Sequence, residues 1–461
     1  MTINPSGLLE PQLPHVKKLI DSLYINGFAV DLSSTGVGKT YCACAIAREM
    51  TVPFVVIAPK AVLPAWRRVL DSFGLIATLL INYEKIGRGN TDYMKWKKLP
   101  DPSSRNSTET VEMPEFKFPP HCLVILDEGH KCKAKGSSNA WMLIALALQG
   151  YKTLVCSATL ATSPLEMRAV GYLCKLHKLH DFNSFCRAHG AEWVGRYGAL
   201  NYNATSPQAR EAMILLHNYL FFELKCASRL TVEDMGATFP ETQIIAEAYD
   251  MGENGNKIKD VYDEMEAELD RLAEISENYQ EHIFAVLIAA RRKVETLKIP
   301  LFVERIEDLY DEGKSVVIFV NFTDTVNSIF EKLRKDLKQS VTFVVGGQSP
   351  AERQFCIDDF QSDKKRIIIC NIAAGSTGIN LHDLNGVFPR ATLISPTWSA
   401  VNLRQCLGRV WRQNGLSKSI QFIIYAANCI EEEICRNVQF KLTNLDTLQD
   451  GDLSEITRFV N

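Results

Sequence analysis

A glycine-rich segment followed by a lysine and a threonine has the composition of a phosphate-binding loop. Residues 34–40 read S-T-G-V-G-K-T and follow an apolar run at 28–32, which predicts a short buried strand. The glycines at 36 and 38 would let backbone N–H groups turn towards phosphate oxygens. Lys39 would neutralise the β- and γ-phosphates, and the Thr40 hydroxyl would hold Mg²⁺. The segment therefore predicts binding of a nucleoside triphosphate.

This loop departs from the strict pattern G-x-x-x-x-G-K-S/T at one position. Ser33 stands where the first glycine would be. A glycine-rich turn between a strand and a helix, with no ligand, is the competing interpretation. Residues 41–50 predict a helix, and its positive N-terminus would face the phosphates.

A pair of acidic residues supplies the second half of the expected chemistry. Residues 122–126 form a continuous apolar run, typical of a central parallel strand, and Asp127 and Glu128 follow it directly. Ligands of open α/β sheets bind at such carboxyl ends. Asp127 would hold Mg²⁺, and Glu128 would orient or deprotonate the attacking water. A solvated loop is the alternative, but the two motifs together indicate that the chain binds and hydrolyses ATP with Mg²⁺.

A basic block near the C-terminus could complete this site. Arg409 and Arg412 are three residues apart, so they would share one face if the segment is helical. A guanidinium that reaches the γ-phosphate can stabilise transition-state charge. If it comes from a second lobe, hydrolysis requires closure, which couples chemistry to movement. A solvated basic helix face is the alternative.

Strand-like and helix-like patterns alternate in both halves of the chain, which favours parallel sheets with crossover helices. The expected fold class is α/β, with two parallel-sheet lobes in tandem, at 1–240 and 241–461, and helical insertions. The expected strands are 28–32, 54–58, 78–82, 122–126 and 153–156 in the first lobe, and 315–320, 341–345, 366–370, 391–395 and 420–425 in the second.

Other segments are expected to lie outside the sheets. Residues 100–120 carry Pro, Ser, Thr and Asn with little periodicity, so we expect a surface loop over about 86–120. Helical protrusions are expected at about 165–235 and 252–300, and a helical tail at the C-terminus.

Composition is ordinary for a soluble globular protein. The 461 residues are 46% hydrophobic and 23% charged, with a net charge of −3, which argues against a tail-driven nucleic-acid binder but allows a local basic cleft. No apolar run approaches a membrane span, and residues 1–14 lack the pattern of a secretion signal. The 13 cysteines form no disulfide-like framework, which predicts reduced thiols in a cytoplasmic compartment.

On these residues the chain resembles the superfamily 2 helicase-like ATPases, and among them the Snf2-type double-stranded DNA translocases. Gln12 resembles the family's adenine-reading glutamine. Residues 55–60 resemble motif Ia, and residues 81–84 resemble motif Ib. Residues 127–130 match the D-E-x-H box, with a glycine in place of a common alanine. Residues 157–159, S-A-T, match motif III, which links hydrolysis to movement.

The resemblance continues through the second half and covers nearly the whole chain. Residues 317–322 resemble motif IV, and residues 374–381 resemble motif V. Trp398 stands where these proteins carry a proline-tryptophan segment near DNA. Residues 405–415 resemble motif VI, although the order of the polar residues differs from the usual R-x-G-Q. The resemblance implies two RecA-like lobes.

The resemblance also implies roles for individual residues. For the nucleic-acid contacts given at the end of this paragraph, structural roles are the alternative. An Asn or Thr at a strand end is also a common turn or cap residue, and Trp398 could belong to the core. The expected catalytic residues are Lys39, Asp127, Glu128, Arg409 and Arg412. ATP would be bound by Gln12, Thr35, Gly36, Val37, Gly38, Lys39 and Thr40, and Mg²⁺ by Thr40 and Asp127. Coupling residues would be His130, Ser157, Thr159, Gly378 and Gln405. Nucleic-acid contacts would come from Lys60, Asn82, Asn321, Thr377, Asn380 and Trp398.

The function that this resemblance implies is ATP-dependent translocation along double-stranded DNA by a compact, monomeric motor without accessory domains. Such a motor would track the phosphate backbone, which carries position without sequence. A strand-separating DNA or RNA helicase is the alternative, and a decayed, ATP-gated nucleic-acid-binding protein is a third. A cytoplasmic location in a bacterial or phage-infected cell is expected, or a nuclear one in a eukaryote.

A group of cysteines and histidines raises the question of a zinc site. Cys174, His177, His180, Cys186 and His189 lie within 16 residues. Their spacing is not that of a standard zinc finger, and leucines interleave at helical intervals. We therefore expect an amphipathic helix rather than a metal site.

Overall fold

The computed structural model describes residues 7–89, 91–104, 108–194, 199–204, 206–275, 280–375, 378–412 and 414–450. The chain divides into two compact units. Unit 1 contains the described residues up to Gly236 together with those from Phe440 onward, and unit 2 contains Ala237–Gln439. The first division lies close to the expected boundary at residue 240. The C-terminal tail differs from expectation, because the end of the last helix packs with unit 1 rather than with unit 2.

Unit 1 is built on a parallel sheet with the strand order β10-β1-β7-β6-β2-β3. Its register pairs Cys156 with Asp31 on one side and with Asp127 on the other. The carboxyl ends of three neighbouring strands therefore lie level at one edge. The strands are β1 (Phe28–Asp31), β2 (Phe54–Ala58), β3 (Leu79–Asn82), β6 (Leu123–Asp127), β7 (Lys152–Cys156) and β10 (Ala227–Ser228).

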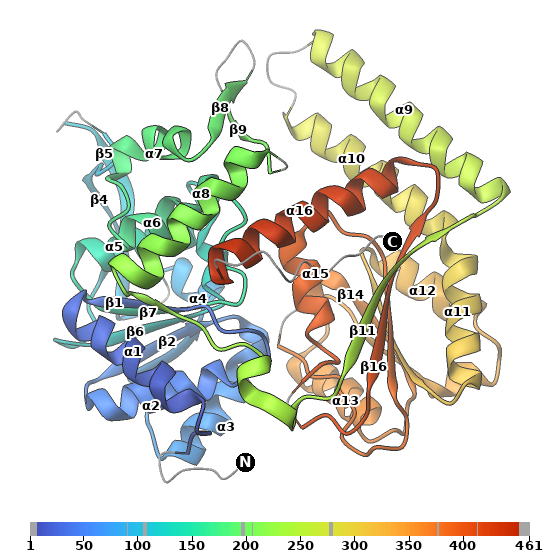
Figure 1. Ribbon diagram of the computed structural model, residues 1–461, viewed down its shortest axis with the longest axis horizontal. Coiled ribbons are helices and arrows are strands. Elements are labelled where there is room, and N and C mark those ends of the chain that lie inside the picture. Colours follow the sequence, from blue (N-terminus) through green and yellow to red (C-terminus); the bar gives the residue numbers. More distant parts are fainter. Residues whose placement is uncertain are drawn as a thin grey trace. The chain divides into compact units, whose positions relative to one another are not determined.

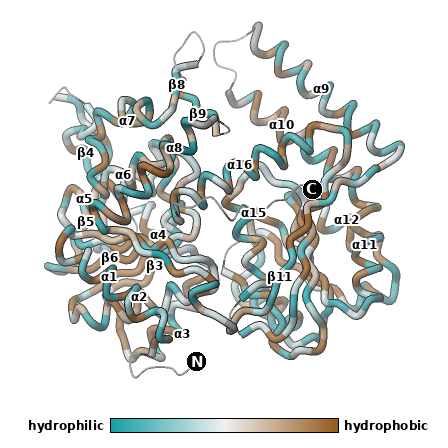
Figure 2. Tube along the Cα trace, in the orientation of Figure 1, coloured by the Kyte–Doolittle hydropathy of each residue, from teal (hydrophilic) through white to brown (hydrophobic). Residues whose placement is uncertain are grey.

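Helices connect these strands and cover the sheet (Figure 1). Strands β1, β2 and β6 are buried along their whole length, as expected for a parallel sheet. Figure 2 shows the hydrophobic trace concentrated in these strands. The helices are α1 (Gln12–Ile25), α2 (Lys39–Met50), α3 (Leu63–Phe73), α4 (Tyr83–Gly87), α5 (Ser138–Leu148), α6 (Arg168–Leu173), α7 (Phe182–Ala188) and α8 (Pro207–Asn218).

Two hairpins in unit 1 differ from the sequence-based expectation. The segment expected to be a surface loop contains β4 (Met94–Pro100) and β5 (Thr110–Phe116), which pair antiparallel. Met94, Met113 and Phe116 are buried in the unit 1 core, although Pro, Thr and Glu interrupt the apolar pattern around them. The expected helical protrusion at 165–235 includes a second hairpin, β8 (Ala191–Val194) with β9 (Ala199–Tyr202).

Unit 2 is built on a second parallel sheet, with the strand order β11-β16-β15-β12-β14-β13. Both units therefore confirm the expected α/β fold with tandem parallel sheets. Strand β11 was not expected, because its residues are mostly half-buried and the segment lacks a continuous apolar run. The strands are β11 (Thr242–Tyr249), β12 (Ser315–Val320), β13 (Val341–Val344), β14 (Ile367–Asn371), β15 (Arg390–Ile394) and β16 (Ser419–Ala426).

Helices α9 and α10 occupy the segment expected to be a helical protrusion, and they run side by side in unit 2 (Figure 1). A small cluster that includes Ile258, Tyr262 and Val294 forms their shared core. The helices of this unit are α9 (Glu253–Ile275), α10 (Gln280–Leu297), α11 (Ile299–Asp311), α12 (Thr323–Lys332), α13 (Pro350–Gln361), α14 (Ile372–Gly375), α15 (Ala400–Leu407) and the first part of α16 (Ile430–Asp450).

Two further features concern membrane-spanning helices and the state of the cysteines. In the described part of the chain, no helix combines the length and the apolar character that a membrane crossing requires. The cysteines are free thiols, and most of them are buried in the two cores.

Candidate active site

The phosphate loop joins the end of β1 to the start of α2 at the carboxyl edge of the unit 1 sheet. Gly36 and Gly38 have φ values of 88° and 94°, in the left-handed region that favours glycine. A Cβ on Gly38 would lie 2.5 Å from Nε2 of Gln12. Gln12 itself donates from Nε2 to the Val37 carbonyl at 2.8 Å. Gly38 is therefore required both by its backbone conformation and by the approach of the glutamine.

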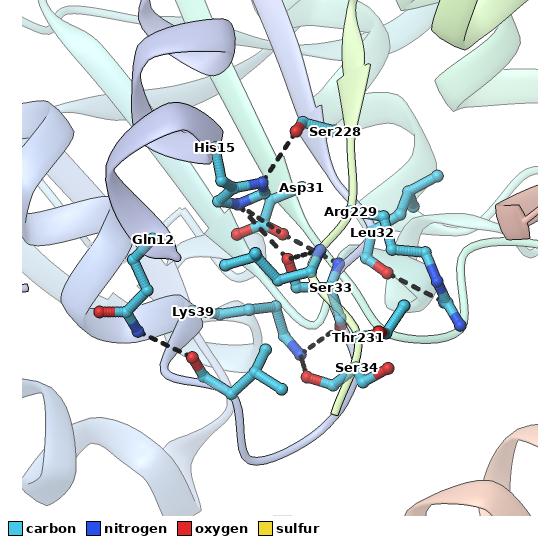
Figure 3. A network of polar contacts seen from close by, with 12 residues as sticks. Gln12, His15, Asp31, Leu32, Ser33, Ser34, Lys39, Ser228, Arg229 and Thr231 are labelled. Atoms are coloured by element: carbon cyan, nitrogen blue, oxygen red, sulfur yellow. Dashed lines mark hydrogen bonds and ion pairs between the residues drawn. The ribbon is translucent and has the colours of Figure 1, made fainter. Parts of the chain in front are cut away.

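Lys39 is held inside the loop by backbone carbonyls. Its Nζ donates to the carbonyls of Ser33 at 2.8 Å and Ser34 at 2.9 Å (Figure 3). Burial lowers the pKa of Lys39, whereas the carboxylates of Asp31, Glu128 and Asp127 act in the opposite direction. The ammonium group thus lies near carboxylates at the sheet edge, in a position to bind an incoming phosphate.

Asp127, at the end of β6, is fixed by two residues from distant parts of unit 1. The indole Nε1 of Trp66 donates to Oδ2 of Asp127 at 2.8 Å, and the Tyr83 hydroxyl donates to its backbone carbonyl at 2.8 Å. The Glu128 N–H donates to the remaining oxygen, Oδ1, at 3.0 Å. Trp66 and Tyr83 were not among the expected site residues, since their sequence positions give no sign of this contact.

The environment of Asp127 disfavours its charged form when no cation is bound. Burial, together with the neighbouring charge of Glu128, raises the pKa of Asp127 to about 6. Oxygen donors are the ligands that Mg²⁺ prefers, and the Asp127 carboxylate and the Thr40 hydroxyl both supply them. The donor set therefore fits Mg²⁺, and a bound cation would offset the cost of the buried negative charge.

Glu128 and His130 connect the acidic pair to the S-A-T segment. Glu128 has a φ of 55°, an unusual conformation for a non-glycine residue that often marks a functional position. His130 Nδ1 lies 3.3 Å from Glu128 Oε2, and 3.4 Å from both Ser157 Oγ and Thr159 Oγ1. The imidazole therefore joins the expected water-activating carboxylate to the expected coupling residues.

The glycine of the D-E-G-H sequence has a local steric reason. A Cβ on Gly129 would lie 2.3 Å from Cγ1 of Val155 on β7. Alanine, which is common at this position in the resembled family, would force the segment carrying Glu128 and His130 away from β7.

The S-A-T segment has a further contact that the sequence did not predict. Gln449, near the end of α16, donates from Nε2 to the Ala158 carbonyl at 2.7 Å. Its Oε1 accepts from Arg229, whose Nη1 also donates to the Leu32 carbonyl at 3.3 Å. The C-terminal helix thus contacts the expected coupling segment directly, and is linked through Arg229 to the residue before the phosphate loop, within unit 1.

In unit 2, the two expected catalytic arginines have different surroundings. Helix α15 ends at Leu407, so the condition for Arg409 and Arg412 to share a helical face is not met. Arg409 is buried and donates to the carbonyls of Gln405 at 2.9 Å and Ile379 at 3.0 Å, which joins motif VI to motif V. Arg412 is only partly buried. Arg409 is therefore held by backbone carbonyls of motifs V and VI, whereas Arg412 lies closer to the surface of unit 2.

The expected nucleic-acid contacts also separate into two groups. Asn82 caps α4, accepting from the Lys85 N–H, and the side-chain amide of Asn321 bonds Glu295, Arg291, Ser395 and Pro396 within unit 2. These bonds favour structural roles. Lys60 and Asn380 are exposed, and Trp398 is half-buried with the Arg291 guanidinium 5.2 Å from its ring centre. Gly378, expected as a coupling residue, has a φ of 74°. Thr377 lies outside the described residues.

The cysteine and histidine group is occupied by contacts that are not metal ligation. His177 packs against both Phe182 and Phe185, and Cys186 Sγ lies 3.7 Å from the Pro164 carbonyl. Across the described ranges, no group of three or more His, Cys, Asp or Glu residues has the geometry of a metal site.

Comparison with known proteins agrees with this fold. The family described as helicase conserved C-terminal domain matches residues 298–414. The chain is 32% identical over 455 residues to a protein of Acanthamoeba polyphaga mimivirus named as an ATP-dependent RNA helicase, covering 96% of this chain and 83% of that protein. It is 23% identical over 419 residues to a Bacillus subtilis (strain 168) protein named as an ATP-dependent helicase/translocase, covering 84% of this chain and 43% of that protein.

Two tandem parallel-sheet units, a phosphate loop and a D-E-x-H box define a helicase-like ATPase. The chain belongs to the superfamily 2 helicase-like family, and it is a nucleic-acid-dependent ATPase of the helicase class.

Proposed function

We propose that this protein uses ATP hydrolysis at the carboxyl edge of the unit 1 sheet to separate the strands of an RNA or DNA duplex. The observation that carries the proposal is the 32% identity, over 96% of the chain, to the viral protein named as an ATP-dependent RNA helicase. The grouping of Lys39, Asp127 and Glu128 at one sheet edge supports the ATP-hydrolysing step. Strand separation therefore takes precedence over duplex translocation, which the sequence motifs alone had favoured.

The proposed chemistry assigns one task to each charged group. Bound Mg²⁺ would supply positive charge that neutralises the phosphates, and Asp127 would help to hold it. Lys39 would leave the Ser33 and Ser34 carbonyls to contact the phosphates. Glu128 orients the attacking water and accepts its proton, and His130 transmits the change to Ser157 and Thr159.

Arg412 of unit 2 completes the proposal. We assign it to the γ-phosphate, where a guanidinium stabilises transition-state charge. Replacing it with alanine (Arg412→Ala) should reduce nucleic-acid-stimulated hydrolysis about a thousandfold, the lower end of the usual range for such arginines, while retaining nucleotide affinity. Steady-state hydrolysis and equilibrium ATP binding measure the two quantities, and normal stimulation in this variant would remove Arg412 from the mechanism.

Strand separation is tested with tailed duplexes of RNA and of DNA, each carrying a labelled short strand. The proposal predicts ATP-dependent release of that strand, and no release by Glu128→Gln or with a non-hydrolysable nucleotide. ATP hydrolysis without release from any duplex would contradict strand separation.

Translocation along double-stranded DNA is the second candidate. It is supported by the Bacillus subtilis relative named as a helicase/translocase and by the resemblance of the motifs to Snf2-type proteins. Its distinguishing result is ATP-dependent displacement of a third strand from a DNA triplex, with the underlying duplex left paired. Release of strands from tailed duplexes without triplex displacement would exclude this candidate.

A further inference from the structure

A buried histidine behind the phosphate loop has no place in the hydrolytic mechanism. His15 lies on α1, one turn after Gln12, so the two side chains share one face of the helix. Both are 3% exposed. A buried imidazole needs hydrogen-bond partners, and those of His15 come from two separate segments of unit 1, the end of β1 with the residues after it and strand β10.

The contacts of the ring converge on the start of the phosphate loop (Figure 3). Nδ1 lies 2.8 Å from Ser228 Oγ on β10. Nε2 lies 3.3 Å from Ser33 Oγ and 3.4 Å from Asp31 Oδ1. Because Asp31 can only accept when ionised, we assign the ring proton to Nε2, so that Nδ1 accepts from Ser228.

Ser33 links the His15 contacts to Lys39, the expected catalytic lysine. Its backbone N–H donates to Asp31 Oδ1 at 2.9 Å, and its hydroxyl accepts from the Leu230 N–H at 3.0 Å. Its carbonyl accepts from Nζ of Lys39 at 2.8 Å. Ser33 replaces the first glycine of the strict phosphate-loop pattern, and its hydroxyl provides a contact that a glycine would lack.

Asp31 adds an electrostatic link between the same groups. Burial opposes ionisation of its carboxyl group, but the neighbouring His15 imidazole and Lys39 ammonium group, with a hydrogen bond from Ser33, hold the pKa of Asp31 below the ordinary value. A charged Asp31 in turn attracts both the imidazole and the ammonium group.

The other end of the loop is held by the same helix face. Gln12 donates from Nε2 to the Val37 carbonyl at 2.8 Å, and its Oε1 accepts from the Leu9 N–H at 2.9 Å. Helix α1 therefore contacts the loop at both ends, through His15 at Ser33 and through Gln12 at Val37.

We propose that His15 is a positioning residue that fixes helix α1 to the start of the phosphate loop, so that base recognition by Gln12 and phosphate binding by Lys39 depend on each other. This inference rests on the proposed role of the site in binding ATP. It predicts that selectivity for ATP over GTP depends on a side chain that contacts neither the base nor the phosphates.

The test compares ATP and GTP binding by the full chain, using fluorescent analogues and competition with the unlabelled nucleotides. His15→Ala should weaken ATP binding about tenfold and reduce the preference for ATP over GTP by a similar factor. His15→Gln, which retains a donor near Asp31 and Ser33, should recover most of both losses. In a Gln12→Ala background, His15→Ala should change the preference no further, because coupled residues are non-additive.

Ser22→Ala provides a matched structural control. Ser22 is buried on the same helix and donates to the Phe28 carbonyl of the same strand at 2.6 Å, but it lies away from the loop. This variant should lower the melting temperature without changing the ATP preference. If His15→Ala lowers the melting temperature as Ser22→Ala does and leaves the ATP preference intact, His15 is merely structural and the inference is wrong.

Binding measurements also separate this inference from the proposed function. If the wild-type protein does not separate strands, the proposed function is wrong. ATP binding and its dependence on His15 can still be measured in that case, so the inference is tested independently. An additive effect of His15→Ala in the Gln12→Ala background would contradict the coupling while leaving the proposed function in place.

Discussion

Both parallel sheets have one edge at which the carboxyl ends of the strands lie, but the side chains there differ. The unit 1 edge carries charged groups, and the unit 2 edge carries amides. In unit 1, Lys39, Asp127 and Glu128 gather where β1 and β6 end, and the only partners of the Lys39 ammonium among the described hydrogen bonds are loop carbonyls. In unit 2, the equivalent edge carries Asn321 and Asn371. These amides bond backbone and side-chain groups of the same unit.

A main partner of Asn321 is a buried carboxylate from the helical pair, whereas Asn371 donates to the Asn321 carbonyl. Glu295 on α10 accepts from the Asn321 N–H, the Asn321 side chain and the Phe322 N–H. One sheet edge thus concentrates charge that a phosphate and a cation would balance, and the other satisfies its polar groups internally. The difference teaches that a parallel sheet places polar groups at one edge, while the loops and helices around that edge decide whether they bind a ligand.

Removal of the water-activating carboxylate should have the largest effect. Glu128→Gln retains the shape of the side chain but cannot accept a proton, so turnover should fall roughly a thousandfold while ATP binding persists. Hydrolysis and binding assays on the same preparation measure both. Glu112→Gln, on the exposed face of β5, is the control and should behave as wild type. Unchanged turnover in Glu128→Gln would invalidate the site.

The closed edge of unit 2 should respond in stability rather than in ATP binding. Glu295→Gln replaces a buried acceptor of N–H groups by a side chain with one donor end, which should cost about 3 kcal/mol. Denaturant unfolding gives this value. Glu264→Gln, at an exposed ion pair with Lys293 on the same helical pair, should change little. Equal effects in the two variants would refute the structural role of Glu295.

Gly129→Ala should produce a smaller effect at the charged edge. The added Cβ would overlap Cγ1 of Val155 and should cost about 1–3 kcal/mol, with a reduced turnover because Glu128 and His130 move. Thermal unfolding and hydrolysis rates measure both. Gly87→Ala, where the nearest atom is Ser138 Oγ at 3.6 Å, is the control. A fully active, stable Gly129→Ala would show that this packing does not restrict the acidic pair.

The smallest expected effect is a dependence of Mg²⁺ affinity on pH. The pKa of Asp127, raised to about 6, means that protons compete with the cation below that pH. Mg²⁺ affinity should therefore fall about fivefold between pH 6 and pH 5, and change little between pH 7 and 8. The free energy of unfolding of the metal-free protein should depend on pH in the opposite direction. A raised carboxyl pKa stabilises the folded state below about pH 4, and this stabilisation is lost as the pH rises through 6. Titration calorimetry of Mg²⁺ with bound nucleotide at each pH would test this, and a flat profile would contradict it.

The sequence was sufficient for the interior of both sheets. Strands β2 and β12 begin and end where their apolar runs predicted, because a strand buried on both faces must be apolar throughout. Hairpin β4–β5 and strand β11 could not be predicted in the same way. Their residues alternate irregularly between buried and exposed, and their pairing depends on tertiary contacts.

Short motifs predicted the charged residues of the site, but not what holds them. Trp66 and Asp127 are 61 residues apart, and Gln449 and Ala158 are 291 apart, so no local spacing relates either pair. Asn321 illustrates the converse. Its position after a strand is equally compatible with a ligand contact and with the internal network that the structure has.

The most direct test is the rate of ATP hydrolysis with no nucleic acid, and then with single-stranded RNA, single-stranded DNA, duplex RNA or duplex DNA. The proposed function predicts slow basal hydrolysis, stimulation at least tenfold by a nucleic acid, and loss of both in Glu128→Gln. A preference for RNA or single strands would agree with strand separation, and stimulation by duplex DNA alone would favour translocation. No hydrolysis with any of these, or equal hydrolysis by Glu128→Gln, would contradict the assignment of the unit 1 edge as a catalytic site.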